Sequence, residues 1–97
     1  MTALKDFERL ECLGVWRASD EAQRRDVIVS LGDASLTISD PNETAIAHWS
    51  LPAVERINPG KRPALYRPGE DATEMLEISD DTLIRAIKKV QAAIERR

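Results

Sequence analysis

This 97-residue chain has few of the residues that usually carry out chemistry: one cysteine, one histidine and no long apolar run. Cys12 has no second cysteine to pair with, so an internal disulfide is excluded, as is typical of a reducing compartment. No stretch is apolar enough for a signal peptide or a membrane span. We therefore expect the chain as given to be cytoplasmic.

The sequence also lacks the motifs of common catalytic and cofactor sites. It contains no P-loop, no GxGxxG and no HExxH pattern. His48 has no cysteine or second histidine at a metal-ligand spacing, and we interpret it as a surface residue of a strand. Trp49, its neighbour, is predicted to lie on the opposite, core face. We predict no metal, no cofactor and no enzymatic activity.

The charge balance argues against one class of partner. Lysine and arginine total 14 against 17 aspartates and glutamates, which gives a net charge of −3. Affinity for nucleic acid comes from basic clusters that displace counterions from phosphates. We therefore predict no nucleic-acid binding.

Residues 24–41 (RRDVIVSLGDASLTISDP) show the clearest local pattern, the period-2 alternation of a half-buried antiparallel pair. Glycine readily adopts the positive φ that a type II′ turn requires, so Gly32-Asp33 predicts a two-residue hairpin turn. The alternating apolar positions are Val27, Val29, Leu31, Ala34, Leu36 and Ile38.

Helices are predicted at the two ends of the chain. Residues 1–13 place Leu4, Phe7 and Leu10 at a three-residue spacing, which predicts a short helix that ends at Gly14. Residues 80–97 predict a long terminal helix with one apolar stripe, which must dock on a sheet because such a helix is marginal alone in water. The members of that stripe are Leu83, Ile87, Val90 and Ile94.

Residues 14–79 between these helices predict antiparallel strands. TAIAHWSL (44–51) predicts a strand that ends or bulges at Pro52, and ALYRP and EMLEIS predict two more. For AVERIN (53–58), a helical or irregular segment and a further strand both remain open. The whole chain thus predicts one α+β domain, residues 1–97.

The order of these elements resembles the pleckstrin-homology (PH) superfold, with a strand beginning GVWR, successive hairpins and a closing C-terminal helix. The segment AIAHWSLPAVERI is similar to the middle of that family's domain. The resemblance implies a bent, partly closed antiparallel barrel of about six or seven strands, capped by the last helix. More narrowly, the chain resembles the N-terminal soluble region of uncharacterised bacterial membrane proteins. That likeness implies a place on the cytoplasmic face of the inner membrane, through a continuation after Arg97.

The resemblance also implies candidate sites. The family's phosphoinositide-binding positions, on the first two strands and the loop between them, correspond here to Arg17, Arg24 and Arg25. Three acids lie in the same stretch, so headgroup binding is disfavoured, because an anion needs cations that are not cancelled. These acids are Asp20, Glu21 and Asp26.

A second basic group surrounds a proline-rich turn, where Lys61, Arg62 and Arg67 form a candidate interaction loop. From all of this we predict a non-catalytic protein-interaction or scaffolding module whose partner is not specified. Its contact site is expected at a groove or a free strand edge, by peptide docking or strand addition. The alternatives are a peripheral binder of anionic headgroups and a small ligand carrier or enzyme.

Overall fold

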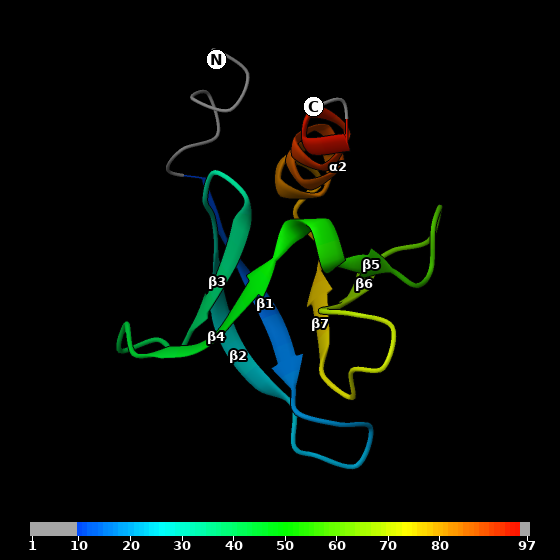
Figure 1. Cartoon of the computed structure of the whole chain (residues 1–97). Helices are drawn as coiled ribbons and strands as arrows, with labels where there is room; N and C mark the ends of the chain where they lie inside the picture. The colour runs from blue at the N-terminus through cyan, green and yellow to red at the C-terminus, as the bar shows by residue number, and fades with distance from the viewer. Residues whose placement is uncertain (1–9, 96–97) are drawn as a thin grey trace.

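The structure, a computed structural model, describes residues 10–95. Seven antiparallel strands form one sheet in the order β4-β3-β2-β1-β7-β6-β5, and the sheet curls into a half-barrel (Figure 1). In chain order the elements are β1 (Glu11–Arg17), β2 (Arg25–Leu31), β3 (Ser35–Ser39), β4 (Ala45–Ser50), the 3-10 turn η1 (Leu51–Ala53), β5 (Glu55–Arg56), β6 (Ala64–Arg67), β7 (Met75–Ile78) and the helix α2 (Asp81–Glu95). The predicted α+β class is confirmed.

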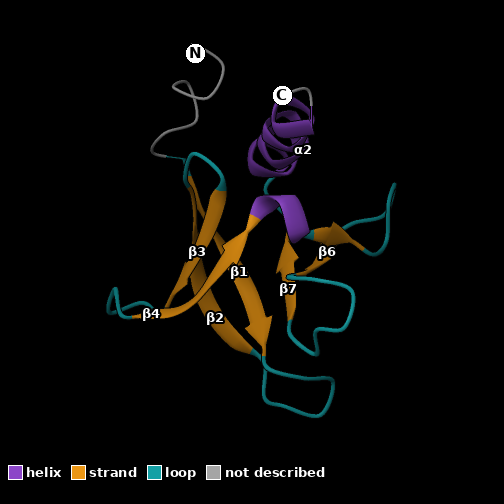
Figure 2. Cartoon of the chain, in the orientation of Figure 1, coloured by secondary structure: helices purple, strands orange, loops and turns teal. Residues whose placement is uncertain are grey.

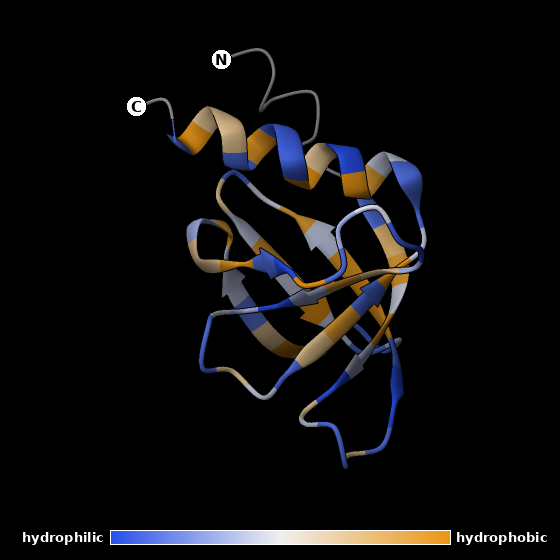
Figure 3. Ribbon diagram, turned by 90° about the vertical axis from the view of Figure 1, so that its right-hand side faces the viewer, coloured by the Kyte–Doolittle hydropathy of each residue, from blue (hydrophilic) through white to orange (hydrophobic). Residues whose placement is uncertain are grey.

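Helix α2 lies across one end of the half-barrel, and the β1–β2 and β6–β7 loops lie at the other end (Figures 1 and 2). The hydropathy colouring of Figure 3 shows apolar and charged residues alternating along α2, as expected for a helix that docks by one face. Leu83, Ile87 and Val90 are buried, as predicted, and their burial contributes about 5–9 kcal/mol in total. The Asp80 carboxylate caps the helix, accepting a hydrogen bond from the Leu83 amide at 2.9 Å.

The β2–β3 hairpin is confirmed, but the position of its turn is different from the prediction. Leu31 pairs with Leu36, and the loop between the strands comprises three residues, 32–34, closed by a bond from the Gly32 amide to the Ser35 carbonyl at 2.8 Å. Gly32 has an ordinary φ, so the predicted type II′ turn at Gly32-Asp33 is wrong. The longer loop lets Leu31 and Leu36 face each other in the core, which fixes the register.

The first strand begins earlier than expected. β1 starts at Glu11 instead of Gly14, so residues 11–13, predicted as the end of a helix, belong to the sheet. Leu10 precedes the strand and has no regular secondary structure, and residues 1–9 of the predicted helix lie outside the described residues. Gly14 does not end a helix. It sits in mid-strand opposite both Val27 of β2 and Ile78 of β7, where the chains approach closely.

The segment AVERIN, for which the sequence permits a helical or irregular stretch or a further strand, is mostly irregular. β4 ends at Ser50, one residue before the η1 turn that contains Pro52, as expected for a residue that cannot donate to a ladder. After η1 the chain forms only the two-residue strand β5, which pairs with β6. β5 therefore forms one edge of the sheet and β4 the other. Trp49 is buried and His48 is exposed, as predicted.

Candidate functional site

The three arginines at the family's headgroup positions each have a partner within the domain. Arg17 lies 3.9 Å from Asp20, and Arg24 forms an ion pair with Glu77. The guanidinium of Arg25 lies over the Trp16 ring, 5.9 Å from its centroid. The three side chains therefore do not form a cluster of free positive charge.

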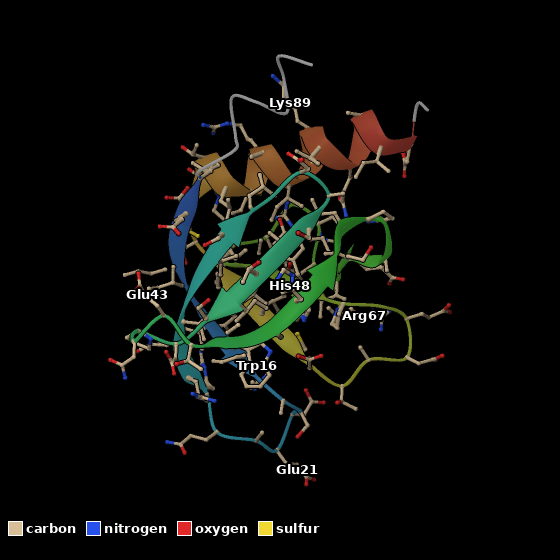
Figure 4. The ribbon with its side chains drawn as sticks, turned by 60° about the vertical axis from the view of Figure 1, so that its left-hand side comes forward. Trp16, Glu21, Glu43, His48, Arg67 and Lys89 are labelled. Carbon is tan, nitrogen blue, oxygen red and sulfur yellow. The ribbon has the colours of Figure 1, made fainter. Side chains whose placement is uncertain are left out.

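The hollow beside these arginines is acidic. It lies at the end of the half-barrel away from α2, where Figure 4 shows Trp16 and Glu21, and has a volume of about 440 Å³. Asp20, Glu21 and Glu74 line it, and its one cationic residue, Arg67, is itself bound to Glu55. This arrangement repels an anion such as a phosphorylated headgroup.

The second predicted group, Lys61, Arg62 and Arg67, is divided among different partners. Arg62 forms an ion pair with Asp81 at the start of α2, whereas Arg67 makes two hydrogen bonds to Glu55 on β5, at 3.1 and 2.6 Å. Lys61 lies exposed in the β5–β6 loop. The Arg62 ion pair thus ties the β5–β6 loop to α2, and the Arg67 bonds tie β6 to β5. Lys61 remains exposed at the surface of the loop.

Asn58 fixes the shape of this loop. Its side-chain amide donates to the Pro63 carbonyl at 2.9 Å, and its Oδ1 accepts from the Leu65 amide at 2.8 Å. Gln91 of α2 similarly donates to the carbonyls of Leu51 and Val54, at 3.0 and 2.9 Å. These bonds anchor α2 to the first residue of η1 and to the residue that follows η1, directly before β5.

A groove of about 410 Å³ runs between β5, the β5–β6 loop and α2, and we call it the β5–α2 groove. Its lining comprises an apolar set, Pro59, Tyr66, Ile84 and Ile87, and a polar set, Arg56, Arg85, Lys88 and Gln91. Among residues 10–95, no carboxylate lines it.

Tyr66 and Arg56 lie close together in the floor of this groove. Burial raises the pKa of the Tyr66 phenol, while the positive charge of Arg56 acts in the opposite direction. The Arg56 Nη2 donates to the Lys61 carbonyl at 2.8 Å, and its Nε is buried with no hydrogen-bond partner among residues 10–95. Arg56 is thus held against the floor, and within residues 10–95 its charge is not paired with a carboxylate.

Sequence reasoning anticipated a groove or a strand edge but did not identify the residues of the groove. The available signal was on α2, where Ile84, Ile87, Lys88 and Gln91 follow the i, i+3, i+4, i+7 spacing of one helical face. That these residues face β5 depends on the fold.

The two residues with intrinsic chemical reactivity lie apart from the groove's lining. Burial and the negative charge of Asp80 raise the pKa of the Cys12 thiol to about 11, so the nucleophilic thiolate is scarce at neutral pH. His48 lies on the β4 edge, where its Nε2 is 3.3 Å from the Thr37 hydroxyl. Across residues 10–95, no three His, Cys, Asp or Glu side chains gather as a metal would require, and no helix has the length and apolarity to span a membrane.

No protein-family model and no curated protein sequence matches the chain. Two solved structures are similar to it in fold. Vav1 bound to an allosteric inhibitor matches with a TM-score of 0.58 at 12% identity, over 92% of this chain and 28% of that chain. Autoinhibited Vav1 matches with a TM-score of 0.55 at 13% identity, over 93% of this chain and 18% of that chain.

At these identities the likeness concerns the fold alone. Vav1 contains a PH domain, and the curled antiparallel sheet with its C-terminal helix is the arrangement found here. The chain is therefore an α+β domain with a PH-like fold, as its sequence predicted. It spans less than a third of either Vav1 chain.

Proposed function

We propose that this chain is a non-catalytic interaction module that holds a segment of a partner protein in the β5–α2 groove. The observation that carries the proposal is an apolar floor formed by Tyr66, Ile84 and Ile87 beside a sheet edge where, among the described residues, β5 pairs only with β6. Apolar floors next to sheet edges are common peptide-docking surfaces. The interaction role typical of PH-like folds agrees with this proposal.

Docking by side chains fits this site better than strand addition. β5 contributes only Glu55 and Arg56 to the sheet, so an added strand would gain few ladder hydrogen bonds. The helical wall is longer, because it extends from Ile84 to Gln91 over two turns. A partner would therefore gain affinity chiefly from apolar side chains placed between α2 and the β5–β6 loop.

A catalytic role has less support than an interaction role. The Cys12 thiol is protonated at neutral pH, and the exposed His48 has only a threonine hydroxyl as a hydrogen-bond partner within residues 10–95. A small-ligand carrier would need an enclosed pocket with converging polar groups. The β5–α2 groove is open, and its anchoring polar residue Gln91 is already bonded to the backbone.

We further propose that the domain works at the cytoplasmic face of a bacterial membrane as one part of a longer protein. The support for this setting is the resemblance of the sequence to the soluble N-terminal regions of bacterial membrane proteins. The fold neighbours bear only on the length of the protein, because in Vav1 a unit of this size accounts for 28% or less of the chain.

Photo-crosslinking in the cells that express the protein tests the groove. A photoreactive amino acid at Lys88, which lines the groove, should capture a partner, whereas the same residue at His48, on the opposite sheet edge, should not. Both positions are exposed, so neither replacement should disturb the core. Capture from position 48 but not from position 88 would move the contact to β4 and contradict the proposal.

A further inference from the structure

We infer that the segment bound in the β5–α2 groove is acidic, with carboxylates alternating with apolar residues. This inference rests on the proposed function. Three cationic residues, Arg56, Arg85 and Lys88, line the groove, and no Asp or Glu of the described part of the chain does. The chain as a whole carries a net charge of −3, so the groove has the opposite sign to the protein that contains it.

These three cations are not used for internal ion pairs. Within residues 10–95 the ion pairs are formed by other arginines, those at positions 17, 24, 62 and 67. Arg56 donates to a neutral carbonyl, and neither Arg85 nor Lys88 makes a side-chain hydrogen bond within the same residues. Their charges are therefore free to pair with a ligand.

The spacing of the helical pair also points to an external anion. Arg85 and Lys88 are three residues apart on α2 and both are exposed, so their like charges repel. An anion between them would turn this repulsion into attraction.

The positions of the apolar and basic residues in the groove predict the sequence pattern of the bound segment. The apolar floor lies between cations on β5 and on α2, and side chains of an extended peptide alternate in direction. Apolar residues at every second position would enter the floor, and acidic residues between them would lie beside the basic rim. An acidic segment would also be repelled from the other hollow, which Asp20, Glu21 and Glu74 line.

A membrane surface is the competing explanation for the positive charge on α2. The neighbouring residue Lys89 distinguishes a membrane surface from a peptide in the groove. Lys89 is exposed and adjacent to Lys88, and it lines a hollow on the outer side of the helix with Thr82 and Ala92. Arg85 and Lys88 line both this hollow and the β5–α2 groove, whereas Lys89 does not line the groove. Figure 4 shows Lys89 on the outer side of α2. A flat anionic surface would use both lysines, whereas a peptide in the groove would use Lys88 far more than Lys89.

The test is a selection from a random-peptide display library against the whole chain, followed by affinity measurements on Lys88→Glu, Lys89→Glu and Ile84→Ser. Selected peptides should be acidic with interspersed apolar residues. Lys88→Glu should weaken their binding about tenfold, and Lys89→Glu should weaken it about twofold or less. Ile84→Ser should also weaken it, because it removes apolar floor without changing the charge. Thermal melts of the variants, all at partly or fully exposed positions, check that each is folded.

The outcomes separate this inference from the proposed function. Neutral or basic peptides that depend on Ile84 would overturn the acidic partner and leave the groove standing. A selection without peptides that depend on Ile84 would overturn the groove and the inference together. Sedimentation with phosphatidylserine vesicles, weakened equally by Lys88→Glu and Lys89→Glu, would assign the positive charge to a membrane surface and overturn the inference.

Discussion

Alanine in place of Gly14 should destabilise the domain, although alanine usually stabilises a strand relative to glycine. A Cβ built at position 14 would lie 2.9 Å from the Glu77 carbonyl oxygen and 3.1 Å from a methyl group of Val29. The carbonyl belongs to β7, which is paired with β1 at this point and cannot move away without weakening the ladder. Overpacking costs about 1–3 kcal/mol, and the lower entropy of the unfolded chain offsets about 0.4–1 kcal/mol. The net loss should be about 1–2 kcal/mol.

Urea and thermal unfolding, followed by tryptophan fluorescence, measure this loss. For a domain of this size it corresponds to a melting temperature lower by about 5–10 °C. Gly69→Ala is the matched control, because nothing lies within 4 Å of a Cβ there and its φ is not positive. That variant should be neutral or slightly stabilised. If Gly14→Ala were as stable as Gly69→Ala, the close approach of β1 and β7 described here would be refuted.

Three further predictions concern Cys12 and the cellular setting. At mildly alkaline pH, Cys12 of the native protein should react with iodoacetamide much more slowly than Cys12 of the urea-unfolded chain, because folding raises its thiol pKa from 9.0 to about 11. Equal rates would contradict the burial of this thiol. The same shift should make stability fall as pH rises from about 9 to about 11, since the unfolded thiol ionises first. Cys12→Ala should show a smaller fall, and the part that remains is due to Tyr66, whose pKa is also raised by burial. On fractionation of source cells, an antibody to the domain should detect a band larger than 10.9 kDa in the membrane pellet, and a soluble band near 10.9 kDa would contradict the membrane setting.

Much of the fold could be predicted because its strongest patterns are local. Alternation at Val27 and Val29 identified a strand, and the spacing of Leu83 and Ile87 identified the helix that docks on it. The start of β1 could not be predicted in this way. Leu10 shares its spacing with Phe7 and Leu4, which favours a helix over a short window, whereas pairing with β2 and β7 decides that residues from Glu11 onward are a strand.

The candidate site depended even more on the fold. Arg56 lies about thirty residues before Arg85 and Lys88, and no local pattern indicates that all three line one groove. The sequence did indicate that charges near Arg17 and Arg24 are cancelled, and the structure shows the partners of both. The sequence could not indicate that Glu74, from the β6–β7 loop, completes the acidic hollow at that end.

The most direct test of the central claim is the photo-crosslinking comparison, extended to a third position at Glu21 in the acidic hollow. The same photoreactive residue at Lys88, His48 and Glu21 reports on the β5–α2 groove, the β4 edge and the open end of the half-barrel. If the groove binds the partner, a protein should be captured from position 88 and from neither of the other two positions. Adding Ile84→Ser should abolish that capture. Capture from position 21 in the absence of capture from position 88 would contradict this prediction, because the contact would then lie at the end of the domain opposite α2.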